Sequence, residues 1–405
     1  MPTTFERNEH RGSRRVLGIC CTTHAAHDGL SDTLYVLLPV LAEQYGLSLA
    51  QVGMIRGAHR AAMALFQVPV GLLSERVGER ILLVGGTALA GAAFILTGLS
   101  SGFLALLLTL FLAGLGQSVQ HPLCSSILST AFSADRRRGA LGTYNFAGDL
   151  GKFTIAGSTS LVLAAGVAWQ APAIGFGAML VLGAGLLMFA LMWTNAGGLP
   201  AVPESADIKK AKGWGITDRG GFVSLCAIGA IDSATRAGVL TFVAFLMLAK
   251  GVSEGWALQA IPAVLVGGMV GKLACGYLAD RIGVIRTVVI TEVATAIGII
   301  LVVVLPNVAA FVLLPLLGIA LNGTSSVLYG TIGDLVESNR QSRAFGLFYT
   351  LIAICGIAAP LAYGMLGQWT GIETALTIAA CLVLLTLPFA LALRPAVARH
   401  ATAAW

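Results

Sequence analysis

The sequence predicts an all-α membrane protein of twelve transmembrane helices, arranged as two similar halves of six. Three observations predict this class: a very apolar composition, apolar segments of helix length, and basic residues confined to alternate loops. Of the 405 residues, 57% are hydrophobic and only 11% are charged, and the mean hydropathy is +0.85. Soluble domains carry roughly 25% charged residues. This chain therefore has too little polar surface to face water on all sides.

The apolar segments have the length of membrane-spanning helices. Crossing about 30 Å of hydrocarbon takes about 20 residues as a helix, and a backbone in lipid must satisfy its own hydrogen bonds, which leaves helices or closed barrels. The short alternating segments typical of a barrel are missing from the sequence. We therefore expect helices over residues 16–42, 50–74, 80–100, 103–132, 138–166, 170–194, 219–249, 256–279, 285–305, 308–334, 342–367 and 371–393.

Lys and Arg lie in alternate loops and in both tails. Most of the 25 basic residues belong to these segments, whereas the intervening loops contain only Lys250. Because basic loops stay on the cytoplasmic side, both termini are expected in the cytoplasm, and the number of spans must be even. A multi-pass protein of a bacterial inner membrane fits this pattern. The asymmetry also explains the net charge of +6, so the expected surroundings are a lipid bilayer and not nucleic acid.

One long polar stretch, residues 195–218, falls midway along the chain. It is expected to connect the two halves on the cytoplasmic side. The predicted organisation is a cytoplasmic tail over 1–15, a six-helix bundle over 16–196, a linker over 197–218, a second bundle over 219–394 and a tail over 395–405.

A loop pattern occurs twice, 205 residues apart. It follows the second span and again the eighth, and each copy joins an acid and basic residues to a glycine turn. Two halves in the same orientation, related by an axis along the membrane normal, account for such a repeat. The first copy contains Gly71, Glu75, Arg76, Gly78 and Arg80, and the second contains Gly276, Asp280, Arg281 and Gly283.

This repeated loop resembles the signature loop of the major facilitator superfamily, with Glu75 where the family has Asp. The resemblance implies the major facilitator fold, alternating access around a central cavity, and gating roles for the loop residues. The N-terminal half is also similar to the fosmidomycin-resistance branch of efflux proteins. That similarity rests on Leu38-Pro39, on the segment 47–53, on His121-Pro122 with Ser125-Ser126, and on Gly148-Asp149-Leu150-Gly151.

Ionisable side chains inside the spans mark the candidate site, because a charge in hydrocarbon is expensive and is usually kept for function. Several recur four residues apart and so share one helix face, as His24, Asp28 and Asp32 do. The resemblance to the major facilitator superfamily implies that the span 285–305 faces lipid. This span carries a single acid, Glu292, near its cytoplasmic end. Away from the ends of the other spans, the ionisable side chains are His24, His27, Asp28, Asp32, Arg56, His59, Arg60, His121, Asp149, Lys152, Asp232, Arg236 and Lys272.

Three interpretations of these groups remain open. They could be ion pairs that hold helices together, with Asp149 and Lys152 able to pair locally. They could bind an anionic substrate, to which Arg is well suited; the candidates are Arg56, Arg60, Lys152, Arg236 and Lys272, with Asp32 and Asp149. Finally, an acid whose ion pair breaks during the transport cycle could carry a proton; the candidates are Asp28 first, then Asp232, with His24 and His121.

The leading hypothesis is a monomeric, proton-coupled secondary transporter that exports a small polar or anionic compound by proton antiport. Uptake of an organic anion by proton symport is the alternative, and a transporter-like receptor or assembly factor is an alternative of another class. No nucleotide-binding loop, metal-ligand spacing or cofactor motif occurs in the sequence. We therefore expect no enzyme activity, no cofactor and no bound metal.

Overall fold

The computed structural model describes residues 4–198, 216–332, 335–336 and 341–403. Within these ranges the chain is helical, apart from short connections and an isolated β-bridge between Ile216 and Val336. Three pairs of consecutive helices (α4 with α5, α9 with α10, α14 with α15) are separated by only two residues each. The fifteen described helices therefore form twelve segments, which confirms the predicted all-α fold.

Contacts divide the chain into two compact units. We call Met1–Val40 with Ala58–Asp207 the N-terminal unit, and Leu41–Gly57 with Ile208–Trp405 the C-terminal unit. The predicted linker 197–218 falls at this division, although residues 199–215 of it lie outside the described part of the chain. The exact domain boundaries stay a prediction.

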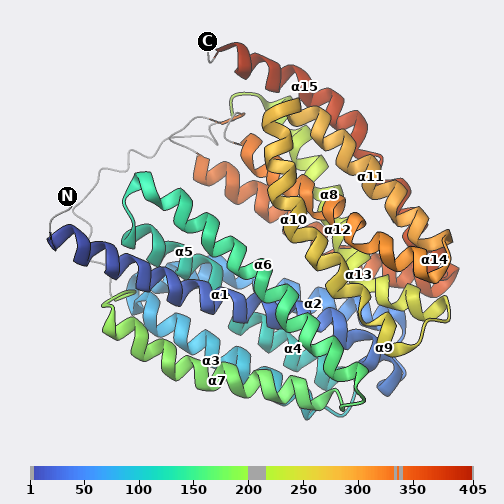
Figure 1. Cartoon of the computed structure of the whole chain (residues 1–405), viewed down its shortest axis with the longest axis horizontal. Helices are drawn as coiled ribbons and strands as arrows, with labels where there is room; N and C mark the ends of the chain where they lie inside the picture. The colour runs from blue at the N-terminus through green and yellow to red at the C-terminus, as the bar shows by residue number, and fades with distance from the viewer. Residues whose placement is uncertain (1–3, 199–215, 333–334, 337–340, 404–405) are drawn as a thin grey trace. The chain divides into compact units, whose positions relative to one another are not determined.

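The first seven helices belong mainly to the N-terminal unit (Figure 1). Helices α3 and α7 lie side by side and approach each other at Gly91 and Gly177, where a Cβ on either would lie 2.6 Å from the carbonyl oxygen of the other. Small residues at such crossings are typical of helix packing in membranes. The helices are α1 (Thr4–Tyr45), α2 (Leu49–Val77), α3 (Glu79–Gly98), α4 (Phe103–Gln117), α5 (Gln120–Ala131), α6 (Ala134–Ala164) and α7 (Gln170–Trp193).

The remaining helices form the C-terminal unit. Its core is an apolar cluster that includes Phe222, Leu225, Val288, Leu328 and Phe348. The helices are α8 (Arg219–Ala249), α9 (Glu254–Ala257), α10 (Ala260–Ile282), α11 (Val284–Val304), α12 (Asn307–Ile332), α13 (Gln341–Thr370), α14 (Ile372–Val383) and α15 (Thr386–Ala403).

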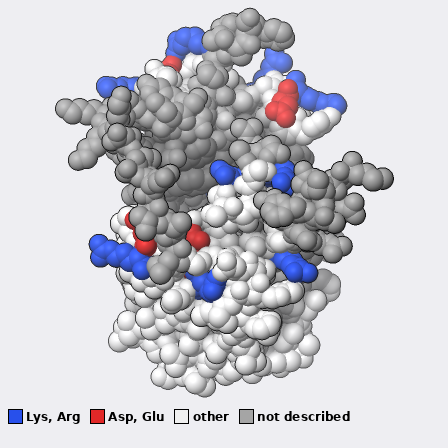
Figure 2. All heavy atoms as spheres, turned by 90° about the vertical axis from the view of Figure 1, so that its left-hand side faces the viewer, with Lys and Arg blue, Asp and Glu red and all other residues white. Residues whose placement is uncertain are grey.

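The outer surface of the helices is apolar. Nine described stretches are long and apolar enough to cross a membrane, and α1, α2 and α6 fall outside this group. These three helices carry many of the ionisable side chains singled out above, which lower their hydropathy. Leu182, Leu186 and Phe189 project from α7 with 66–73% of their surface exposed. On the face that Figure 2 shows, the lower part, where Figure 1 places α3 and α7, carries no charged side chain.

The repeated loop has the same backbone geometry in both units. Gly78 precedes α3 with φ 91° and ψ 145°, and Gly283 precedes α11 with φ 90° and ψ 153°. Both lie in a region that residues with a Cβ rarely adopt, so these two glycines are required by the turn. Gly71 and Gly276 instead lie inside α2 and α10, where an added Cβ would meet open space. The glycine pattern of the sequence thus combines one turn residue and one helix residue in each copy.

Basic residues of these loops make local contacts within their own unit. Arg80 donates through Nε and a terminal nitrogen to the Ala196 carbonyl, at 2.9 and 2.7 Å, and its backbone N–H donates to the Gly197 carbonyl at 2.7 Å. It therefore ties the start of α3 to the segment after α7. In the second copy, the Arg281 guanidinium lies 4.4 Å over the Tyr277 ring. The gating roles of the loop residues stay a prediction.

Two charged residues of the C-terminal unit stabilise helix ends. Asp218 caps α8 by accepting from the Gly221 N–H at 2.8 Å; this hydrogen bond and the paired Arg399 guanidinium hold the pKa of Asp218 below its usual value. Lys250 donates through Nζ to the carbonyls of Val302 and Leu305 at the end of α11, at 2.8 and 2.6 Å. A cation at a helix C-terminus complements the helix dipole.

Candidate functional site

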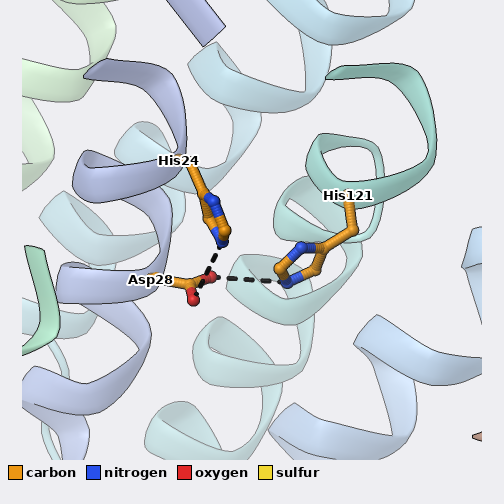
Figure 3. A group of neighbouring side chains, drawn as sticks. All are labelled: His24, Asp28 and His121. Carbon is orange, nitrogen blue, oxygen red and sulfur yellow. Dashed lines mark ion pairs between the residues drawn. The ribbon is translucent and has the colours of Figure 1, made fainter. Parts of the chain in front are cut away.

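The N-terminal unit brings four ionisable side chains from three helices together around Asp28. We call His24 and Asp28 of α1, His121 of α5 and Lys152 of α6 the Asp28 cluster. Asp28 Oδ2 lies 3.1 Å from His24 Nε2 and 3.0 Å from Lys152 Nζ, and Asp28 Oδ1 lies 3.4 Å from His121 Nε2. Figure 3 shows His24 and Asp28, one turn apart on α1, with His121 approaching from the neighbouring helix. Three of the four predicted proton-coupling residues therefore meet in one place.

The cluster has a buried part and an accessible part. The side chains of His24 and Asp28 are 3% and 8% exposed, whereas those of His121 and Lys152 are 39% and 26% exposed. Lys152 also lies 3.3 Å from Asp149 Oδ1, which is the local pair expected from their spacing. His121 and Lys152 are therefore the accessible members of the cluster, and Asp28 and His24 are its buried members.

The hydrogen bonds fix the tautomer of His24. Its Nδ1 lies 2.8 Å from the backbone carbonyl oxygen of Tyr144. A carbonyl oxygen only accepts, so Nδ1 carries the hydrogen. In the neutral ring, Nε2 is then a lone pair that faces a carboxylate oxygen at 3.1 Å. This contact is attractive only when a proton lies between the two atoms, either on the imidazole or on the carboxyl.

Tyr144 and Gln120 hold the His24 ring in this position. The Tyr144 ring stacks on His24 with centroids 4.1 Å apart, and its hydroxyl accepts from Gln120 Nε2 at 2.6 Å. Both residues are almost fully buried. The sequence analysis did not assign these two residues to the site, because neither carries a charge that would stand out in a membrane span.

Two glycines of α6 allow the helix to approach α1 at the site. A Cβ on Gly148 would lie 2.5 Å from the His24 imidazole, and one on Gly151 would lie 2.1 Å from the Ala25 carbonyl oxygen. Gly29 of α1 faces the same contact, since its Cβ would meet the Gly151 carbonyl at 2.6 Å. The Gly148-Asp149-Leu150-Gly151 segment thus makes room for His24 and brings Lys152 within reach of Asp28.

We expect Gly148→Ala to destabilise the folded protein by about 2 kcal/mol, because overpacking forces the His24 ring or the helix backbone to shift. Gly142→Ala is the matched control on the same helix, since a Cβ there meets nothing within 4 Å. That control should be neutral or slightly stabilising, as alanine favours helices over glycine. Thermal unfolding in detergent micelles measures both. Equal melting temperatures for the two variants would show that the close contact is not limiting.

The Asp28 cluster has the donor atoms of a metal site, but the Lys152 ammonium already lies against the carboxylate that would bind the metal ion. Ligand atoms of His24, Asp28 and His121 all lie within 4.8 Å of one another. The Lys152 ammonium contacts the same Oδ2 that faces His24. A metal ion in this place has to displace that ammonium, so the geometry favours exchange of a proton between the imidazole and the carboxyl.

Two further histidines of the N-terminal unit, His27 and His59, have structural partners. Thr87 donates its hydroxyl hydrogen to the Leu83 carbonyl at 2.7 Å, so its oxygen accepts from His27 Nε2 at 2.9 Å. His59 Nε2 donates to Gln117 Oε1 at 2.8 Å, and Gln117 Nε2 donates to the His27 carbonyl at 3.1 Å. His27 and His59 therefore join α1, α2, α3 and α4.

Three further predicted residues, Asp32, Arg56 and Arg60, lie on α1 and α2. Asp32 is buried on α1, one turn beyond Asp28, and the charge of Asp32 and the hydroxyl of Tyr35 act on the Arg60 guanidinium. Arg56 is fully buried and belongs to the segment grouped with the C-terminal unit. A substrate role for Arg56 requires a rearrangement that exposes it. The substrate-binding roles of all three stay predictions.

The C-terminal unit contains a second group of charges. Arg236 lies 3.5 Å from Asp232 Oδ2, one turn away on α8, and Asp232 is 4% exposed. Lys272 is half-buried on α10. Glu292 of α11 is 1% exposed, although the family arrangement implied that its helix faces lipid. A stripe of buried threonines four residues apart (Thr287, Thr291 and Thr295) is the sequence signal for a polar inner face on α11.

A family model described as the Major Facilitator Superfamily matches residues 21–274 and 225–404 of the chain. The fosmidomycin resistance protein of Escherichia coli is 28% identical over 141 residues, which span 35% of this chain and 34% of that protein. The gentisate transporter of Corynebacterium glutamicum is 26% identical over 358 residues, which span 84% of this chain and 79% of that protein. The first of these similarities therefore covers only about a third of the relative.

A solved structure shares the fold over almost the whole chain. It is the crystal structure of a bacterial homolog of the human lysosomal transporter Spinster, in an inward-facing and occupied conformation. The TM-score is 0.81, with 15% sequence identity, over 95% of this chain and 97% of that one. At this identity, the likeness concerns the fold alone.

Proposed function

The chain belongs to the Major Facilitator Superfamily, and on this premise we propose that it is a proton-coupled secondary transporter of small polar or anionic compounds. The family and the fold establish a multi-pass membrane transporter of small organic compounds that works by alternating access. Proton coupling, cargo and direction are the proposed part. So are the location in a bacterial inner membrane, with both termini in the cytoplasm, and the monomeric state.

The contact between His24 and Asp28 is the observation that carries proton coupling. Because the Tyr144 carbonyl accepts the hydrogen of His24 Nδ1, His24 Nε2 presents a lone pair to Asp28 Oδ2 at 3.1 Å, and a proton can bind between these two atoms. Moving Lys152 away from Asp28 removes a stabilising cation and favours the protonated carboxyl; its return favours release of the proton. His121 is accessible and lies 3.4 Å from the other carboxylate oxygen, so it is placed to pass protons to and from water.

Export by proton antiport is the first candidate for direction, and the similarity to the fosmidomycin resistance protein supports it.

Uptake by symport is the second candidate, and one specific observation favours it. Lys152 is bound to Asp28 at 3.0 Å, so protonation of Asp28 releases the ammonium to bind an anionic group of the cargo. Proton and anion then bind together, which is the requirement for symport. The similarity to a gentisate transporter supports an organic anion as cargo.

Flux into proteoliposomes tests coupling and direction together. Purified protein is reconstituted, and accumulation of gentisate, fosmidomycin and a set of mono- and dicarboxylates is measured with the interior either more acidic or more alkaline than the medium. An acidic interior should drive accumulation by an antiporter, and an acidic medium should drive it by a symporter. Collapse of the gradient with a protonophore is the control. Transport that is equally fast with an acidic interior, with an acidic medium and after collapse of the gradient would rule out proton coupling.

A further inference from the structure

Glu292 is a buried acid whose two carboxyl oxygens, Oε1 and Oε2, have no hydrogen-bond partner within the described part of the chain. Its side chain is 1% exposed. The residue lies on α11, about 12 Å from the start of that helix at 1.5 Å per residue.

An ionised carboxylate in this position is strongly unfavourable. Burial removes the hydration of the charge, and without hydrogen bonds no protein group replaces it. A buried acid of this kind therefore takes up a proton and becomes neutral. The hydrogen-bonding groups around Glu292 indicate which form they suit. A protonated carboxyl donates its O–H to an acceptor, whereas a carboxylate only accepts from donors.

The hydroxyl of Thr324 interacts with Glu292 from α12, and its hydrogen is already donated to another group. Thr324 of α12 donates to Thr291 Oγ1 at 2.7 Å, and Thr291 donates to the Thr287 carbonyl on its own helix at 3.0 Å. These hydroxyls can offer a lone pair to Glu292 but not a hydrogen. Such a pocket suits the neutral, protonated carboxyl.

A second carboxyl and one guanidinium act on Glu292 from α8. The charges that reach Glu292 from the described residues are those of Asp232 and Arg236. Helix α12 contributes the uncharged hydroxyl of Thr324. Arg236 lies 3.5 Å from Asp232 and balances one negative charge. With Asp232 ionised and paired to Arg236, a proton on Glu292 leaves this group of three neutral.

We propose that Glu292 and Asp232 form a proton-binding site in the C-terminal unit, made of different residues from the Asp28 cluster. Arg236 stabilises the one carboxylate that remains ionised, and Glu292 holds the proton at neutral pH. The inference deepens the proposed function, because a second site raises the number of protons that a transport cycle can carry. Proton binding itself is measurable without any cargo, so its test is independent of coupling.

Infrared difference spectroscopy between acid and alkaline pH tests the site in purified protein in lipid nanodiscs. The carbonyl stretch of a protonated carboxylic acid should be present at neutral pH and should disappear in Glu292→Gln. Glu373→Gln is the matched control, because Glu373 is an exposed acid in the first turn of α14; it should leave the band unchanged. Asp28→Asn should leave it unchanged too, which separates this site from the Asp28 cluster.

Two further variants test the influence of the Asp232 charge on Glu292 and the assignment of the band to Glu292. Asp232→Asn removes the neighbouring negative charge, so the Glu292 band should be lost at a lower pH than in the wild type. Glu292→Asp, which keeps a titratable carboxyl, should keep a band at a shifted frequency even if Glu292→Gln folds poorly. An unchanged band in Glu292→Gln, or an unshifted band in Glu292→Asp, would overturn the assignment. If the band behaves as expected but transport ignores a proton gradient, the site stands and the proposed coupling fails.

Discussion

Asp28→Asn is expected to abolish proton-driven accumulation in proteoliposomes while the folded protein still binds its cargo. Asparagine keeps the size of the side chain and mimics the protonated carboxyl, but it neither takes up nor releases a proton. The Asp28 cluster then loses the one buried carboxylate that faces His24, His121 and Lys152 together. We expect gradient-driven flux to fall by about 100-fold, the size of effect seen when a proton-transferring group is removed.

The same experiment requires a carboxyl-to-amide control and a separate binding measurement. Glu373→Gln removes an exposed acid and should transport like the wild type. Binding of the transported compound, measured by calorimetry in micelles, should persist in Asp28→Asn. Gradient-driven flux at the wild-type rate in this variant would exclude Asp28 as the coupling residue.

Lys152→Met is expected to lower the free energy of unfolding by about 3 kcal/mol, because it leaves Asp28 buried without the ammonium that now lies 3.0 Å away. Methionine keeps the length and packing of the side chain and removes only the charge. Thermal and chemical unfolding in micelles measure the loss.

A double-mutant cycle separates this ion pair from general packing. Asp28→Asn combined with Lys152→Met should recover most of the stability, since an amide needs no cation beside it. If the double variant is no more stable than Lys152→Met alone, the loss comes from packing, and the ion pair is not what stabilises the cluster.

The helices and the repeat were predictable because each depends on residues close in sequence. Apolar length gave twelve segments, and the two loop copies gave equivalent turns at Gly78 and Gly283. The boundaries were less predictable. The first helix begins at Thr4 instead of residue 16, since a polar helical extension leaves no signal in an apolar count.

The local half of the Asp28 cluster was also predictable. His24 and Asp28 lie four residues apart on one face, and Asp149 and Lys152 lie three apart. The ion pair between Lys152 and Asp28 was not, because it depends on how closely α6 packs on α1 at Gly148 and Gly151. The tautomer of His24 depends on a backbone carbonyl 120 residues away, which no local pattern indicates.

Glu292 shows where reasoning from the family arrangement was incomplete. The position of its helix in the sequence implied a lipid-facing span, and the acid appeared to lie near the membrane surface. The structure instead places it 1% exposed on the inner face of α11, beside Thr291 and near Thr324. The spacing of the threonines was visible in the sequence, but only the packing of α11 on α12 shows that this face is buried.

The central claim is that transport and proton movement occur together through Asp28. Proteoliposomes that enclose a pH-sensitive dye test it most directly, with no imposed proton gradient and with a transported compound added to the medium. The wild type should change the internal pH as the compound enters, and Asp28→Asn should produce no change. Uptake of the compound by the wild type without any change in internal pH would contradict the claim.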